Sequence, residues 1–144
     1  MNYTRLAIAA VAAAVVDMAY GGLVYGMLMA DQFAVFPAVF RATDAQMAYL
    51  PAMFCGILVG MFAATAIYAK GYEGGSGAAE GLRFGILFGI LNAGYFAATS
   101  YAIMNIGRRL PASMAVAGMV EWIIVGVTIG LVYKPSAARS AAAV

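Results

Sequence analysis

Histidine is absent from this sequence of 144 residues, cysteine occurs once, and charged residues make up only 10% of the chain. The missing histidine excludes haem ligation by histidine, histidine-bearing zinc sites and Ser-His or Cys-His catalysis. The lone Cys55 excludes an internal disulfide. A net charge of +2 without a basic stripe gives no reason to expect a nucleic-acid partner. Because no metal-ligand set and no nucleophile–base pair is visible, we expect no cofactor, no metal and no enzymatic activity.

Apolar residues dominate what remains. Hydrophobic residues make up 65% of the chain, and the mean hydropathy is +0.92. Soluble domains carry about 25% charged residues, and a chain this short buries only part of its surface in one core. We therefore expect an integral membrane protein, with the lipid bilayer as its first partner.

Four segments reach the length of about 20 residues that a helix needs to cross the hydrocarbon core. They span residues 6–29, 49–69, 82–104 and 112–133. The chain shows no period-2 alternation, so the expected fold is all-α: a four-transmembrane-helix bundle with antiparallel neighbours. Residues 1–135 form one transmembrane domain in this interpretation, and residues 136–144 form a short polar and alanine-rich tail. The N-terminus resembles a signal peptide, but its apolar run is too long, which favours an uncleaved first span.

Proline and capping residues indicate where helices begin. Thr43 and Gln46 have the spacing of a capping box, which predicts a helix start shortly before the second span. Pro51 then falls inside that helix, where we expect a kink. Pro111 suits the first turn of the fourth helix.

Two connecting segments carry recognisable patterns. Residues 31–43 contain Phe33, Phe36 and Phe40 near helical spacing, which predicts a short interfacial segment with aromatic anchors. A mobile lid over a cavity is the alternative. The glycine-rich residues 71–77 lack the ending of a phosphate-binding P-loop and follow no strand, which favours a hairpin linker.

Polar residues in the middle of the spans are the best candidates for function. Asp17 and Glu121 sit near the centres of the first and fourth spans, and Asn92 lies close to the centre of the third. An ionised carboxylate at this depth costs at least about 2.5–3.5 kcal/mol, so these side chains should turn inward. Tyr20 and Tyr95 each lie one turn beyond a mid-membrane polar residue, and Trp122 follows Glu121. The predicted site therefore comprises Asp17, Glu121, Asn92, Tyr20, Tyr95 and Trp122.

Two functions fit this layer of mid-membrane residues, by which we mean the six side chains of the predicted site. In the first, Asp17 and Glu121 exchange protons while the other four residues hold a cation, water or small molecule and shape a cavity, as in a proton-linked transport or binding protein. In the second, protonated carboxyls bond to neighbouring side chains and join helices, at about 0.6 kcal/mol per bond on average. The chain would then be a structural or accessory subunit of a larger membrane complex.

Small residues repeat at four-residue spacing along every span. Such stripes allow close helix packing in lipid, and several stripes leave homo-oligomerisation open as well as packing within one chain. Cys55, in the second span, is predicted to be a small buried residue. The stripes are Gly22 and Gly26; Gly56 and Gly60; Gly81, Gly85, Gly89, Ala93 and Ala97; and Gly118, Trp122, Gly126 and Gly130.

Basic residues favour one orientation. Lys and Arg residues near the span ends number five on one side and three on the other, a bias that favours both termini in the cytoplasm. The first set is Arg5, Lys70, Arg83, Lys134 and Arg139, and the second is Arg41, Arg108 and Arg109.

The second half of the chain resembles small, uncharacterised bacterial four-helix membrane proteins. The similar stretches are residues 72–85 (YEGGSGAAEGLRFG), 118–122 (GMVEW) and 130–134 (GLVYK). These proteins often carry a glycine-rich loop before the third span and a Val-Glu pair within the fourth. The resemblance implies the same fold and a location in the bacterial inner membrane, and it brings no activity with it.

Overall fold

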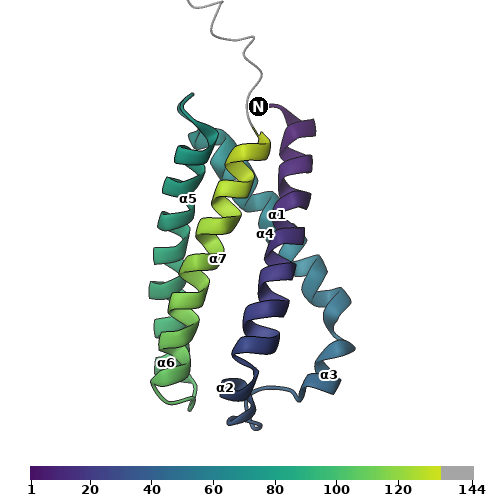
Figure 1. The fold of residues 1–144 in the computed structure, drawn as a ribbon, viewed down its shortest axis with the longest axis vertical. Coiled ribbons are helices and arrows are strands. Elements are labelled where there is room, and N and C mark those ends of the chain that lie inside the picture. The colour runs from purple at the N-terminus through teal and green to yellow at the C-terminus, as the bar shows by residue number, and fades with distance from the viewer. Residues whose placement is uncertain (134–144) are drawn as a thin grey trace, which may run out of the picture.

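The computed structural model describes residues 1–133, so the predicted tail at 136–144 lies outside the described residues. Residues 1–133 contain helices and no strand (Figure 1). The elements in chain order are α1 (Tyr3–Leu23), the π-helical segment η1 (Val24–Leu28), α2 (Ala30–Ala34), α3 (Thr43–Met47), α4 (Leu50–Gly71), α5 (Gly77–Leu91), the π-helical segment η2 (Asn92–Ala97), α6 (Ala98–Ile103) and α7 (Arg109–Tyr133).

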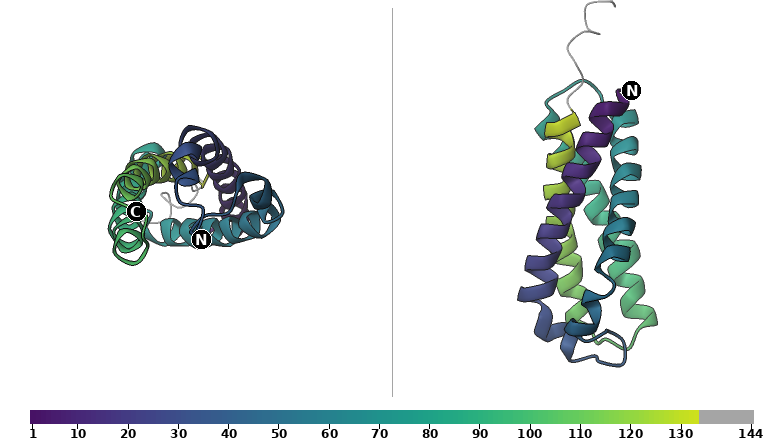
Figure 2. Two further views of the ribbon diagram at one scale, coloured as in Figure 1. Left: turned by 90° about the horizontal axis from the view of Figure 1, so that it is seen from below. Right: turned by 90° about the vertical axis from the view of Figure 1, so that its right-hand side faces the viewer.

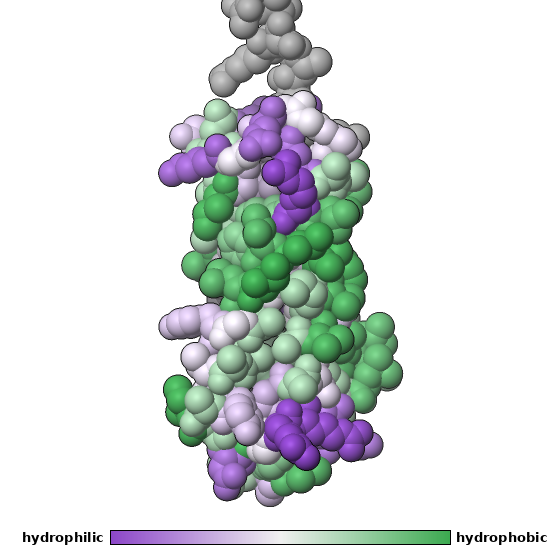
Figure 3. All heavy atoms as spheres, turned by 90° about the vertical axis from the view of Figure 1, so that its left-hand side faces the viewer, coloured by the Kyte–Doolittle hydropathy of each residue, from purple (hydrophilic) through white to green (hydrophobic). Residues whose placement is uncertain are grey.

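Four continuous helical stretches are long and apolar enough to cross a membrane, as an integral membrane protein requires. They are Tyr3–Leu28, Leu50–Gly71, Gly77–Ile103 and Arg109–Tyr133. The all-α four-helix bundle predicted from the sequence is confirmed, with span boundaries shifted by a few residues. On the face drawn in Figure 3, hydrophilic residues gather at the two ends and a hydrophobic band lies between them.

Helix α7 holds the bundle together. It packs most extensively on α5, then on α1, and α1 in turn packs on α4. Consecutive spans run in opposite directions, so the start of α1 and the end of α7 lie at the same end of the molecule (Figures 1 and 2). At that end the rings of Tyr68 on α4 and Phe84 on α5 meet edge to face at 5.5 Å, which joins the two outer helices.

Glycine permits the close packing of α5 on α7. A Cβ atom added to Gly81 would collide with the backbone carbonyl of Gly126, and a Cβ on Gly126 would collide with that of Gly81. Gly77 and Gly130 oppose each other in the same way one turn away. Van der Waals contact between backbones that approach this closely is a main source of helix association in lipid.

The bundle has two hydrophobic clusters at different depths. The upper cluster, near the chain start, includes Ala13, Met61 and Ile129, and the lower cluster includes Ile106 and Leu110. The predicted interfacial segment belongs to the lower end. Its three phenylalanines pack against the lower cluster: Phe33, Phe36 and Phe40.

The predicted kink at Pro51 is wrong. A helix does begin at Thr43, but it ends at Met47, and α4 starts separately at Leu50. Pro51 therefore occupies the first turn of α4, where its missing N–H would have no intrahelical partner.

The prediction that Cys55 is buried is also wrong. Its side chain is exposed, because the first half of α4 leans away from α1 towards α3 (Figure 1). A Cβ built on Gly56 or Gly60 meets no atom of residues 1–133 within 4 Å. The second half of α4 contributes buried residues to the bundle, whereas the first half presents its surface to the surroundings.

Candidate functional site

Two π-helical segments, η1 and η2, continue the first and third spans, and each contacts α7 through a side chain. In η1 the N–H of Met29 donates to the carbonyl of Val24 at 2.8 Å, five residues back. In η2 the N–H of Ala98 donates to the carbonyl of Ala93, again five residues back. Such turns occur mostly as single bulges inside α-helices, frequently at functional sites. Here each bulge supplies one polar side chain to α7, Tyr25 from η1 and Asn92 from η2.

Two tyrosines of the first span, one in α1 and one in η1, both contact α7. Tyr20 and Tyr25 are five residues apart, which on a regular α-helix would place them about 140° apart around the axis. Their rings instead meet edge to face, with centroids 6.2 Å apart and planes at 76°. Both hydroxyls reach α7: Tyr20 donates to the carbonyl of Ala117 at 2.8 Å, and Tyr25 donates to the Oε2 atom of Glu121 at 2.8 Å.

Glu121 retains an unused oxygen. Its Oε2 atom accepts the bond from Tyr25, whereas its Oε1 atom has no hydrogen-bond partner in residues 1–133. Oε1 is also not among the fully buried polar atoms of that part of the chain. The outer oxygen of this mid-membrane carboxyl is therefore open to a proton, a water molecule or a ligand.

Asn92 contacts α7 at a glycine. A Cβ atom added to Gly118 would collide with the Nδ2 atom of Asn92 and would lie 3.7 Å from the hydroxyl oxygen of Tyr25. The side chains of η1 and η2 therefore converge above the bare backbone of Gly118, one turn before Glu121. The amide of Asn92 forms no hydrogen bond within residues 1–133, and its nitrogen packs against the backbone of Gly118.

Asp17 lies at the edge of this group. It is partly buried on α1, one turn before Tyr20. Within residues 1–133 its carboxyl accepts no hydrogen bond, and neither oxygen is a fully buried atom. The contacts thus join Tyr20, Tyr25 and Asn92 to the stretch of α7 from Ala117 to Glu121, and Asp17 lies one turn before Tyr20 on α1.

Two of the predicted site residues lie elsewhere. Tyr95 is 74% exposed and points away from the bundle, so its hydroxyl does not reach the carboxyls as expected. Trp122 is half-buried and stacks on Phe88 of α5, with ring centroids 4.9 Å apart. It belongs to the packing between α5 and α7 and to the rim of the upper cluster.

Sequence reasoning missed Tyr25 as a site residue and gave Gly118 only a packing role. The five-residue spacing from Tyr20 to Tyr25 fits the widened turn of a π-helix, but a periodicity of 3.6 residues conceals it. The signal for Gly118 was its position one turn before Glu121, which leaves space beside the carboxyl. Among the residues that the structure describes, no three Cys, Asp or Glu side chains come together as metal ligands would.

Comparison with known proteins assigns no family and no function to this arrangement of residues. No protein-family model, no curated protein and no solved structure matches the chain. The resemblance of the second half to small bacterial membrane proteins therefore stays a prediction.

Proposed function

We propose that this chain is a proton-linked membrane protein that binds, and moves across the bilayer, a cation or small polar molecule in the layer formed by Asp17, Tyr25, Asn92 and Glu121. The observation that carries the proposal is that only one of the two carboxyl oxygens of Glu121 accepts a hydrogen bond within residues 1–133. Tyr25 holds one oxygen at 2.8 Å, and the other oxygen is free within residues 1–133. Ionisable groups inside a membrane domain commonly mark ion or proton pathways.

The unused polar groups distinguish this proposal from simple helix joining. A carboxyl that serves only to join helices should have its hydrogen-bonding capacity satisfied by neighbours, because unpaired polar groups are costly in hydrocarbon. Asp17 and Asn92 form no side-chain hydrogen bond within residues 1–133. Their unused hydrogen-bonding groups favour a site that binds and releases a water molecule or a ligand.

The two π-helical segments support movement at this level. A π turn can be lost or shifted along a helix when one hydrogen bond changes register, and such a shift rotates the side chains beyond it. Release of Tyr25 from Glu121 would then be coupled to the protonation state of the carboxyl. The layer would open towards one side of the membrane in one state and towards the other side in the second.

Proton flux into proteoliposomes tests this function. The protein is reconstituted with a pH-sensitive dye inside the vesicles, and flux is measured after an imposed pH gradient under a potassium–valinomycin clamp. We expect Glu121→Gln and Asp17→Asn to reduce flux by at least about tenfold. Asp44→Asn, which changes an exposed carboxyl in α3, is the matched control and should leave it unchanged. Wild-type flux in both mid-membrane variants, with folding intact, contradicts the proposal.

A second candidate is an accessory subunit of a larger membrane complex. The first half of α4 favours it. A Cβ atom added to Gly56 or Gly60 would meet no described atom within 4 Å, so no other described helix covers this face. Purification in a mild detergent separates the two candidates. Constant co-purification of one other membrane protein, lost on Gly60→Leu, would favour the accessory role.

The proposed location is the bacterial inner membrane with both termini in the cytoplasm. The start of α1 and the end of α7 share one end of the bundle (Figure 1). Arg5, Lys70 and Arg83 belong to that end, and Lys134 and Arg139 follow it in the sequence. Basic residues accumulate on the cytoplasmic side of membrane proteins.

A further inference from the structure

A cleft of about 240 Å³ opens between α4 and α5, at the end of the bundle where the loop at 72–76 joins them. It is separate from the mid-membrane layer and close to the expected level of the lipid headgroups. Its polar lining consists of Tyr68, Glu73, Glu80 and Arg83. A ligand can bind only to the hydrogen-bonding capacity that these four groups do not already use.

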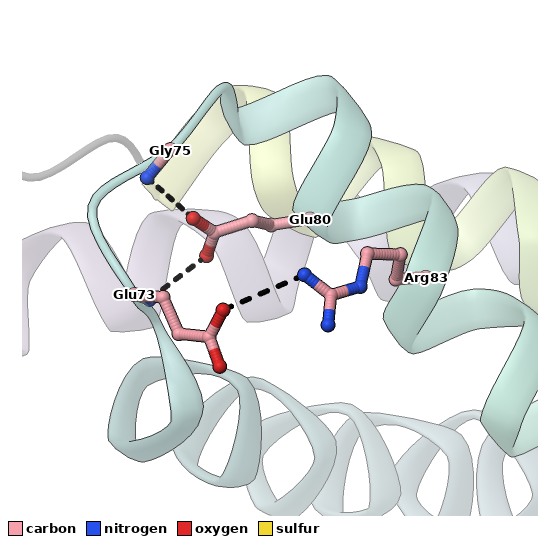
Figure 4. A network of polar contacts seen from close by, with 4 residues as sticks. All are labelled: Glu73, Gly75, Glu80 and Arg83. Carbon is pink, nitrogen blue, oxygen red and sulfur yellow. Dashed lines mark hydrogen bonds and ion pairs between the residues drawn. The ribbon is translucent and has the colours of Figure 1, made fainter.

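Glu80 shapes the loop that borders the cleft (Figure 4). Its carboxylate accepts hydrogen bonds from the backbone N–H groups of Glu73, at 3.1 Å, and Gly75. The loop is thereby held against the first turn of α5, and Glu73 is placed opposite Arg83. Both carboxylate oxygens of Glu80 are therefore bonded to the loop, so Glu80 forms part of the cleft wall and is not available to a ligand.

The ion pair between Arg83 and Glu73 is easily exchanged. The Nη1 atom of Arg83 lies 3.4 Å from the Oε2 atom of Glu73, and both side chains are 72% exposed. Exposed pairs of this kind contribute little to stability. A ligand that carries a negative and a positive group can therefore replace the pair and satisfy both side chains.

Tyr68 gives the cleft a buried donor without a partner. It is the most buried of the lining residues, with an exposed fraction of 4%. Its hydroxyl oxygen is fully buried and has no hydrogen-bond partner in residues 1–133. An unpaired buried hydroxyl is unfavourable. Because this oxygen is closed to solvent in the structure, the Tyr68 ring must turn towards the cleft for a ligand oxygen to accept its bond.

The remaining wall of the cleft is apolar and continues into the lipid-facing surface. It is formed by Ile67, Phe84 and Leu87. Ile67 and Leu87 are 53% and 66% exposed, on the flanks of α4 and α5. The cleft is thus polar towards water and apolar towards the hydrocarbon core, like a phospholipid at the same depth.

We propose that this cleft binds a phospholipid whose headgroup carries a primary ammonium, of the phosphatidylethanolamine class. Its phosphate accepts hydrogen bonds from Arg83, its ammonium donates to Glu73, and an oxygen of the phosphate or glycerol ester accepts from Tyr68. Its acyl chains lie along Ile67 and Leu87. Two carboxylates stand against one guanidinium in the lining, which disfavours an anionic lipid, and a choline headgroup has no N–H to donate to Glu73.

Lipid titration followed by native mass spectrometry tests the proposal. Delipidated protein is titrated with phosphatidylethanolamine, phosphatidylcholine or phosphatidylglycerol that carry identical acyl chains. We expect the ethanolamine lipid to bind about tenfold more tightly than the other two. Glu73→Gln should remove that preference, because Glu73 meets the ammonium. Arg83→Gln should weaken binding of all three lipids several-fold, because each of them carries the phosphate. Tyr68→Phe should weaken binding of the ethanolamine lipid several-fold.

Arg108→Gln, at the opposite end of the bundle, is the matched control and should keep the preference. Circular dichroism of every variant separates a lost site from lost folding, and Tyr68→Phe keeps the ring that packs on Phe84. Equal binding of ethanolamine and choline lipids to the wild type overturns the proposal. Tighter binding of phosphatidylglycerol, or an unchanged preference in Glu73→Gln, overturns it as well.

Discussion

The hydroxyl of Tyr25 donates a 2.8 Å hydrogen bond to the Oε2 atom of Glu121, which links the first span to the last in the middle of the bundle. Tyr25 belongs to the π-helical segment η1, which continues α1 from Val24 onward. The bond has consequences for stability that can be separated from those for function.

Removal of the Tyr25 hydroxyl should destabilise the bundle only modestly. Interhelical hydrogen bonds in membranes contribute about 0.6 kcal/mol on average and about 1.7 kcal/mol at most. We expect Tyr25→Phe to lower the free energy of unfolding within that range while it changes proton flux. Reversible unfolding in mixed micelles measures the first quantity. Tyr95→Phe is the matched control, since the exposed Tyr95 should affect neither; a loss well above this range would show that Glu121 depends on Tyr25 for its burial.

Substitution of Gly126 should be far more damaging than substitution of Gly60. A side chain at Gly126 collides with the backbone of α5 at Gly81 and Gly85, which no rotamer change relieves. We expect Gly126→Val to cost at least about 2 kcal/mol or to prevent assembly of the bundle. Gly60→Val is the matched control, because it adds the same side chain at a position where a Cβ meets no described atom within 4 Å. Unfolding in mixed micelles compares the two, and equal losses would contradict the packing of α5 on α7.

Gly118→Ala should change the site without unfolding the protein. The added methyl group meets the end of the Asn92 side chain, which can rotate away, and it remains in van der Waals range of the Tyr25 hydroxyl. We expect the free energy of unfolding to change by less than about 1 kcal/mol, while proton flux falls. The measurement pairs micelle unfolding with the proteoliposome assay. Gly56→Ala, far from the layer, should preserve flux, and wild-type flux in Gly118→Ala would remove Asn92 from the site.

The single cysteine reports on the position of α4. Cys55 is exposed on the half of α4 that leans away from α1. A spin label on Cys55 in lipid nanodiscs should therefore be mobile and accessible to dissolved oxygen. The matched control is Thr65→Cys in a Cys55→Ala background, because Thr65 is fully buried with an exposed fraction of 0%. An immobile, inaccessible label at Cys55 would show that another chain or helix covers this face.

The spans and the depth of the polar residues follow from the sequence by itself. Backbone groups in lipid must find partners within their own segment, so long apolar runs become helices whatever packs around them. A constant rise along the helix then puts Asp17, Asn92 and Glu121 near mid-membrane without knowledge of the tertiary structure. That is why the four-helix bundle was predictable.

Only the tertiary structure decided which way the side chains face. These helices are apolar around most of their circumference, so no polar face marks the side that packs against the other helices. Tyr20 and Tyr95 have the same relation to a mid-membrane polar residue, yet Tyr20 bonds to α7 and Tyr95 points outward. Gly60 and Gly81 belong to similar stripes, yet only Gly81 meets another helix in the described chain. The physical reason is that rotation about a helix axis depends on local pitch, which the π turns change, and on the sum of many weak packing contacts between helices.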